Sequence, residues 1–351
     1  MIGLIVNIGN ITIEPGFDDY APCEIKKNEY WENVIKLSKI TDENSFIKYM
    51  TSKATFVKGD NATFSHQKFS DCVNKRDVLA RMMYYDLFNW LAGKTSSPPE
   101  DNTISYHSLC IMDFSGFENL ENNTLEQLLV NYGNEKLTYE FQKSTFLEEK
   151  STFDAENLEH LAQTLIEPKA ELILSLLDNE RPSGILQIIE KTSINKKEKL
   201  DRILLANFVK FLKNNELFIK NDDHDDNEFG IKHTASNVTY NVNTFNEKYK
   251  DDFPTYITKY FTSINAKIFD IFRTKNIDET QEKHWTKKGY SSKYKFDINN
   301  IIQFIKEKTK TYYIKCIMPN SEKAKGKWDD SQVIRQVNSL GIESYIRFKK
   351  L

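Results

Sequence analysis

The chain has 351 residues, and its 48 Lys and Arg side chains against 51 Asp and Glu give a formal net charge of −3. This length fits one large or two ordinary domains, and a 39% share of hydrophobic residues is enough for a sizeable core. Without a basic excess we expect no nucleic-acid partner, and without an apolar run of bilayer length we expect no membrane span.

The cysteines are far apart and none follows another at the Cys-x-x-Cys spacing, which argues against a zinc site or a redox pair. Isolated cysteines are typical of a reducing compartment. We therefore expect a cytoplasmic protein without a metal site built from cysteines. The four positions are Cys23, Cys72, Cys110 and Cys316.

The first third of the chain is predicted to be helical. Its apolar start resembles the interior of a longer helix, and periodic apolar residues predict helices over 28–50 and 71–91. Gly93-Lys94-Thr95 looks like the end of a phosphate-binding loop, but it follows a helix rather than a strand. We interpret it as the C-terminus of that helix.

Beyond residue 100 helices predominate and strands are few. A buried strand over 108–112 is predicted to end at Asp113, and a glycine-containing loop follows. The remaining predictions are helices over 124–150, 156–178, 254–272 and 331–348 and from Ile185, strands over 238–242 and 312–317, and loops at 182–184, 220–228 and 274–297. His233 is expected to be a structural hydrogen-bonding group, and Tyr240 and Phe245 to be core residues.

The segment Asp113-Phe114-Ser115-Gly116-Phe117-Glu118 has a pattern suited to nucleotide chemistry. An aspartate at the carboxyl end of a strand lies where open α/β sheets bind ligands. A glycine lets its backbone N–H approach a phosphate closely. By itself, this short pattern is a weak signal, and an ordinary turn explains it better than a nucleotide site does.

A longer pattern around this segment resembles the later half of a myosin motor head. Asp113–Glu118 resembles the second nucleotide switch of that family, and Asn131–Leu137 resembles the start of its relay helix. Further collinear similarities lie at 7–11, 76–90, 233–240, 314–320 and 335–347. The resemblance implies a mostly helical α/β fold, part of a P-loop NTPase-type head, with a few central-sheet strands and a helical lower actin-binding subdomain.

The resemblance also implies a division of the chain. Residues 1–95 would end the upper actin-binding subdomain. Residues 104–320 would contain the second switch, relay helix, lower actin-binding subdomain and transducer strands. Residues 321–351 would form the helix that leads to a converter. A motor fragment is the first hypothesis, with the N-terminal half of the head as its missing partner. A complete, ATP-independent actin-binding or scaffold module is the alternative.

Catalytic and cofactor roles follow from the resemblance alone. The Gly116 amide would contact the γ-phosphate, Asp113 would lie near Mg²⁺ through water, and Glu118 would pair with an arginine of the first switch. Ser115 would join Asp113 and Gly116 in binding ATP. We find neither the Gly-x-x-x-x-Gly-Lys-Ser/Thr loop nor the first switch in the sequence. We therefore expect this chain alone not to bind ATP and Mg²⁺, and to be inactive as an ATPase.

The implied partner is the actin filament, which would place the protein at the cytoskeleton. The helix–loop–helix over 182–197 would supply apolar contacts, and a lysine-rich loop would face the acidic surface of actin. The residues concerned are Pro182, Ile188, Ile194, Lys196 and Lys197, with Lys287, Lys288 and Lys293 from the loop. Core packing remains an equal alternative for Ile188. A solvated surface is the alternative for the lysines, although their place in the family pattern favours the actin-facing assignment.

Overall fold

The computed structural model describes residues 1–18, 21–56, 62–95, 109–158, 169–193, 200–220, 227–243, 245, 260, 264, 269 and 289–349. It divides into two compact units, one from 1–109 with 251–282 and one from 110–250 with 283–351. Helices predominate and the described strands form small antiparallel sheets, so the mostly helical α/β class is confirmed. No described helix is long and apolar enough to cross a membrane.

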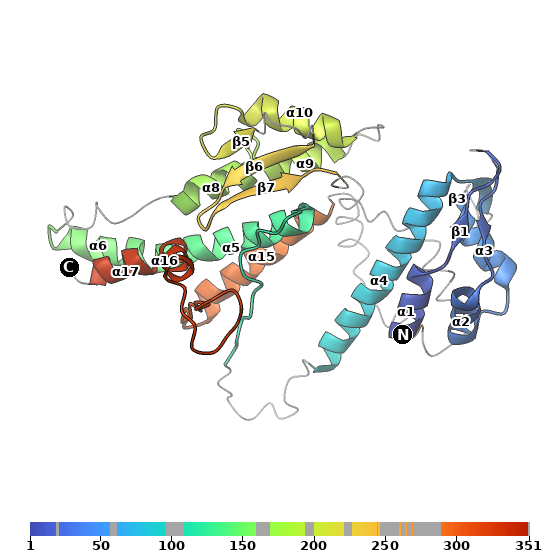
Figure 1. Ribbon diagram of the computed structural model, residues 1–351, viewed down its shortest axis with the longest axis horizontal. Helices are drawn as coiled ribbons and strands as arrows, with labels where there is room; N and C mark the ends of the chain where they lie inside the picture. Colours follow the sequence, from blue (N-terminus) through green and yellow to red (C-terminus); the bar gives the residue numbers. More distant parts are fainter. Residues whose placement is uncertain are drawn as a thin grey trace. The chain divides into compact units, whose positions relative to one another are not determined.

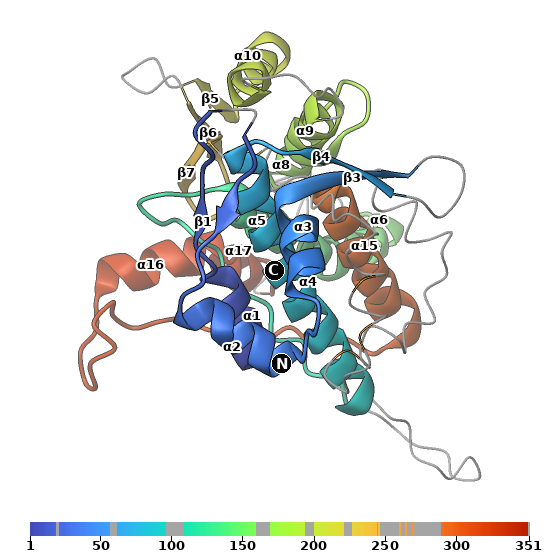
Figure 2. The same cartoon turned by 90° about the vertical axis from the view of Figure 1, so that its right-hand side faces the viewer.

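The first unit is built around a long helix, α4 (Phe69–Thr95), with α1 (Ile2–Gly9) alongside it (Figures 1 and 2). Its other elements are β1 (Ile13–Glu14), β2 (Glu24–Ile25), α2 (Glu29–Ser38), α3 (Glu43–Thr51), β3 (Ser52–Phe56) and β4 (Ala62–His66). The strands form two antiparallel hairpins, β1–β2 and β3–β4.

The predicted helix over 28–50 is two helices with separate caps. Asn28 accepts a hydrogen bond from the Trp31 amide at the start of α2, and Asp42 accepts one from the Ser45 amide at the start of α3. Lys39 follows α2 in the left-handed conformation, with φ of 56°, which ends a helix. Since α4 continues to Thr95, the interpretation of Gly93-Lys94-Thr95 as a helix end is confirmed.

The second unit packs helices around a three-stranded antiparallel sheet. Its helices are α5 (Leu125–Gln142), a π-helical turn η1 (Lys143–Leu147), α6 (Glu148–Ala155), α8 (Lys169–Asp178), α9 (Ile185–Ser193), α10 (Leu200–Leu212), α15 (Tyr290–Lys308), α16 (Asp330–Ser339) and α17 (Ile342–Lys349). The sheet has the order β5 (Phe218–Lys220), β6 (Glu228–Lys232), β7 (Asn237–Asn241). In both views α10 lies above this sheet (Figures 1 and 2).

The register of β6 and β7 places apolar side chains on one face of the sheet. Phe229 pairs with Tyr240 and Ile231 pairs with Val238, and all four side chains are buried. They share a core with α5, α8, α9, α10 and α15. Phe245 belongs to this core as well, so the core assignments of Tyr240 and Phe245 are confirmed.

Two predicted strands are wrong in the described parts. Residues 109–112 and 312–317 have no regular secondary structure and pair with no described strand. Their apolar side chains are largely exposed, with 86% of Ile111 and 86% of Ile314 accessible. A β-prone run becomes a strand only where a neighbour completes its hydrogen bonds.

Three further boundaries differ from prediction. The described end of the predicted loop over 274–297 is helical from Tyr290. The predicted helix over 331–348 is broken at Gly341, where φ is 70°. In the predicted helix over 156–178, residues 156–158 are non-helical and α8 begins at Lys169, with 159–168 outside the described residues. Most of 254–272 and the centre of the acidic loop at 220–228 also lie outside them.

The predicted break at 182–184 is confirmed, and α9 starts at Ile185 as predicted. A Cβ on Gly184 would lie 2.8 Å from the Leu176 carbonyl oxygen and 2.9 Å from the Asn179 nitrogen. The Gly184 amide donates to the Asn179 carbonyl at 2.8 Å. Glycine is therefore required for the chain to turn this closely between α8 and α9.

Candidate functional site

The loop Asp113–Glu118, which we call the switch-like loop, is held on α5 by asparagine side chains. Asn131 Oδ1 accepts from the Glu118 amide at 2.8 Å, and Asn131 Nδ2 donates to the Glu118 carbonyl at 2.7 Å. One turn further along α5, Asn134 Nδ2 donates to the Ser115 carbonyl at 2.9 Å. The two motifs that the sequence suggested therefore contact each other directly.

The residues predicted to meet a nucleotide lie on the outer side of this loop. Asp113, Ser115 and Gly116 are exposed. A Cβ built on Gly116 meets no atom within 4 Å, so the glycine faces open space. No group of three or more His, Cys, Asp or Glu in the described part of the chain is arranged to hold a metal ion. These three residues do not by themselves enclose a triphosphate or its Mg²⁺.

Glu118 differs from its neighbours because it is half-buried. Its Oε2 accepts from Gln127 Nε2 at 3.2 Å, and Gln127 Oε1 accepts from the Thr124 amide at 2.9 Å at the start of α5. The side chain of Thr124 and that of Gln127 form a capping box. The carboxylate predicted to pair with an arginine is thus oriented by the N-terminus of α5.

Behind the loop lies a buried group of polar side chains that we call the polar relay. It consists of Asn131 and Glu135 on α5, His233 after β6, and Tyr240 on β7, each at most 1% exposed. Asn131 Nδ2 donates to Tyr240 Oη at 2.8 Å, and Tyr240 Oη lies 2.8 Å from His233 Nε2. His233 Nδ1 lies 3.1 Å from Glu135 Oε1. The expectation that His233 is a structural hydrogen-bonding group is confirmed.

Further contacts fix both ends of the polar relay. Glu135 also accepts from the Thr234 amide at 2.9 Å and from the Thr234 hydroxyl at 2.7 Å. The Phe117 ring meets the His233 ring edge-on, with centroids 5.2 Å apart. Burial raises the pKa of Tyr240 well above its ordinary value, which keeps the hydroxyl protonated. The sequence placed Asn131 and His233 in separate motifs, and nothing in it signalled that Tyr240 joins them.

The predicted actin-facing residues have different positions. Pro182 is exposed, as a contact residue would be. Ile188 is 3% exposed and packs in the core, so its assignment as a surface contact is wrong and the core alternative holds. Lys293 lies on α15 rather than in a loop and is only partly exposed. Ile194, Lys196, Lys197, Lys287 and Lys288 lie outside the described residues.

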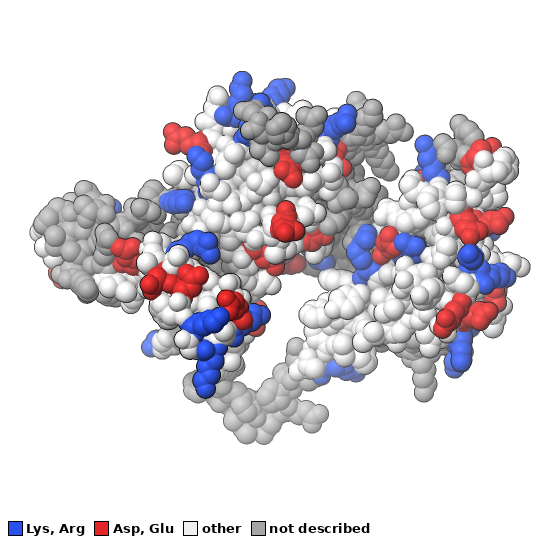
Figure 3. All heavy atoms as spheres, viewed as in Figure 1, with Lys and Arg blue, Asp and Glu red and all other residues white. Residues whose placement is uncertain are grey.

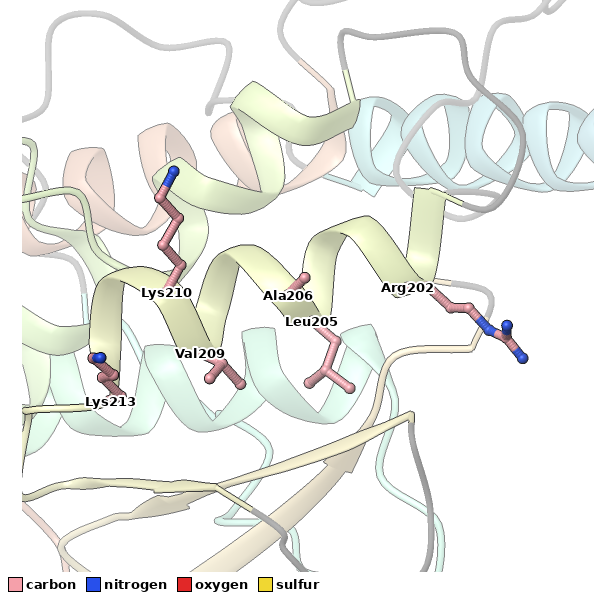
Figure 4. Close-up of a pocket in the computed structure, with 6 residues that line it drawn as sticks. All are labelled: Arg202, Leu205, Ala206, Val209, Lys210 and Lys213. Atoms are coloured by element: carbon pink, nitrogen blue, oxygen red, sulfur yellow. The ribbon is translucent and has the colours of Figure 1, made fainter.

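A surface that the sequence analysis did not single out lies on α10. Arg202, Lys210 and Lys213 are exposed, while Leu205 and Val209 between them are partly exposed. These residues and Ala206 line a shallow, open depression along the helix (Figure 4). Lys and Arg atoms lie over α10 at the top of Figure 3. Positive charges at both ends of an apolar strip make this face suitable for an acidic protein surface.

Asp178 at the end of α8 connects three helices. Its Oδ2 accepts from Tyr132 Oη at 2.6 Å and lies 3.0 Å from Lys136 Nζ, both on α5. Lys295 on α15 donates to the Asp178 carbonyl at 3.0 Å. The Lys295 ammonium is therefore bonded inside this unit.

Comparison with known proteins gives consistent matches along the whole chain. A family model described as "Myosin head (motor domain)" matches residues 1–350. The chain is 28% identical to Myosin-1 of Vanderwaltozyma polyspora over 279 residues, which cover 78% of this chain and 22% of that protein. It is 23% identical to Myosin-4 of Arabidopsis thaliana and 25% identical to Unconventional myosin heavy chain 6 of Caenorhabditis elegans, with 100% of this chain covered in both. Those alignments span 30% and 16% of the two relatives, so the chain corresponds to less than a third of each protein.

Proposed function

Since the chain belongs to the myosin head (motor domain) family, we propose that it binds actin filaments and forms part of an ATP-dependent, actin-based motor at the cytoskeleton. The face of α10 is the observation that carries the actin-binding proposal. It presents exposed positive charges at both ends of an apolar strip, Arg202 at one end and Lys210 and Lys213 at the other (Figure 4). Such a surface complements an acidic filament through both charge and apolar contact.

Within that motor the switch-like loop would contribute one side of the nucleotide site. Its seat on α5 leaves Asp113, Ser115 and Gly116 facing outward, where a second group of residues would complete the site. The N-terminal half of a motor head is the proposed partner that supplies them. The exposed apolar segments at 109–112 and 312–317 support this proposal, because exposed apolar runs are typical of surfaces that a partner covers.

Co-sedimentation of the 351-residue chain with actin filaments tests the proposal. We expect binding at low ionic strength that weakens as salt rises, because exposed charges are screened. Reversing two charges with Lys210→Glu and Lys213→Glu should weaken binding about three- to tenfold. Lys325→Glu, at an exposed loop position in the same unit, is the matched control. Equal pelleting of the charge-reversed and control variants would exclude the α10 face as an actin-binding surface.

A second candidate is ATP-independent actin binding, as an interaction or scaffold module. The open space around Gly116 favours it, because the described loop residues do not enclose a nucleotide by themselves. Pelleting with and without Mg·ATP separates the two. Release of the chain from actin by Mg·ATP supports a motor, and unchanged pelleting supports the module.

A further inference from the structure

The polarity of every hydrogen bond in the polar relay follows from the backbone of Glu118. The Glu118 amide can only donate and its carbonyl can only accept, which fixes the orientation of the Asn131 side-chain amide. One Nδ2 hydrogen of Asn131 goes to the Glu118 carbonyl, so the other is donated to Tyr240 Oη. The switch-like loop therefore sets the direction of the first side-chain bond.

The donor and acceptor roles of Tyr240, His233 and Glu135 follow from this first bond. Because Tyr240 Oη accepts from Asn131, its own hydrogen is donated to His233 Nε2. His233 then carries its proton on Nδ1 and donates it to Glu135 Oε1. The Glu135 carboxylate accepts three bonds, one from His233 and two from Thr234.

A displacement of the loop would break this order. If the Glu118 backbone left Asn131, the amide of Asn131 would lose both fixed partners in a fully buried place. A buried polar group without a partner is costly, so Asn131 and Tyr240 would rearrange together. The Phe117 ring, which touches His233, would move with the same loop.

We propose that Tyr240 and His233 are positioning residues that couple the switch-like loop to the β6–β7 hairpin. This inference rests on the proposed function, because the loop would respond to nucleotide only as part of a motor. Neither residue touches a substrate. Each acts through Asn131 and the Glu118 backbone, and Glu135 with Thr234 ends the relay at the turn between β6 and β7.

Hydrogen exchange on the 351-residue chain, followed by mass spectrometry, tests the coupling. Tyr240→Phe removes only the hydroxyl that joins Asn131 to His233. We expect the Glu118 amide and the Thr234 amide to exchange about tenfold faster, the effect of losing one well-made buried hydrogen bond. The Asn241 amide, which donates to the Asn123 carbonyl at 2.8 Å, is an internal reference that should change less.

Tyr132→Phe is the matched control, because it removes another buried tyrosine hydroxyl from the same core, one bonded to Asp178. Its Glu118 and Thr234 amides should exchange at rates explained by its global stability alone. Equal acceleration in both tyrosine variants, after correction for stability, would overturn the proposal. So would acceleration at only one end of the relay.

His233→Gln provides a second variant should Tyr240→Phe fail to fold. Its side-chain oxygen can accept from Tyr240 Oη in place of His233 Nε2, but its NH2 group does not occupy the Nδ1 position that faces Glu135. We expect faster exchange at Thr234 and a smaller change at Glu118, and the reverse order would refute the relay. The exchange experiment needs neither actin nor nucleotide. A negative pelleting result would therefore contradict the proposed actin binding, and a negative exchange result would contradict the coupling through the polar relay.

Discussion

Replacing Gly133 with alanine measures how closely the switch-like loop packs on α5. A Cβ at Gly133 would lie 2.5 Å from Phe114 Cζ and 2.7 Å from Tyr294 Oη. The tyrosine hydroxyl is the end of a long side chain and can shift. The Phe114 ring is partly buried against the core, so its displacement moves the loop as well.

Two opposing effects determine the size of the change. Alanine is better than glycine in a helix by about 1 kcal/mol. Overpacking of a core costs about 1–3 kcal/mol, and we take about 2 kcal/mol for a contact this short. The expected result is a loss of about 1 kcal/mol in the free energy of unfolding, where an unhindered helix position would gain stability.

Gly93→Ala on α4 is the control, because a Cβ at Gly93 meets nothing within 4 Å. Gly93→Ala should raise the free energy of unfolding of the first unit or leave it unchanged. Urea unfolding followed by circular dichroism is the assay, analysed for two transitions because the chain has two compact units.

A double-mutant cycle with Phe114→Ala isolates the clash. With the ring removed, Gly133→Ala should become stabilising by about 1 kcal/mol, which gives a coupling energy of about 2 kcal/mol. The reasoning would be refuted if Gly133→Ala stabilised the protein by itself, or if its effect were the same with and without the Phe114 ring.

Two further predictions concern charged groups. Burial lowers the pKa of Lys75 from 10.5 to about 8, so between these values the unfolded chain binds more protons and stability rises with pH. Urea unfolding across this range should show a rise of about 1–2 kcal/mol that Lys75→Met abolishes, and an identical pH profile in the variant would contradict it. Asp178→Asn should cost about 1–3 kcal/mol, because Tyr132 and Lys136 lose a carboxylate that is only 15% exposed. Lys327→Ala breaks an exposed ion pair with Glu322 and should change stability by less than about 0.5 kcal/mol. Similar losses in these two variants would show that burial does not set the difference.

Elements with a local signal were predictable from the sequence. The helix α4 was found from its periodic apolar residues, and the start of α5 after Thr124 was predicted correctly. Strand β7 was found from alternation, which the structure repeats as exposed and buried positions. In each of these segments the residue pattern and the packing agree.

Elements that depend on distant neighbours were not predictable. The runs at 109–112 and 312–317 have the composition of buried strands, but strand formation needs a partner that composition does not reveal. The start of α15 is polar and rich in lysine, which resembles a loop until Ile298 and Ile302 are seen to pack in the core. The short strands β1–β4 left no pattern strong enough to detect.

The candidate site shows the same division. The residues of the switch-like loop were found as a motif because they are contiguous. Their support was missed because Asn131 and Tyr240 are 109 positions apart in the chain. Hydrogen-bond partners of this kind are set by the tertiary fold, so a single sequence gives no access to them.

The π-helical turn at Lys143–Leu147 has a geometric consequence for the two helices that it joins. An α-helix advances by about 100° per residue, so one additional residue in a turn rotates everything beyond it by about that angle. The side of α5 that carries Asn131, Asn134 and Glu135 therefore does not continue in register into α6, because the residues of α6 are rotated about the helix axis relative to an unbroken α-helix. If this turn changed between π-helical and α-helical hydrogen bonding, α6 would rotate about the helix axis relative to the end of α5 that holds the switch-like loop.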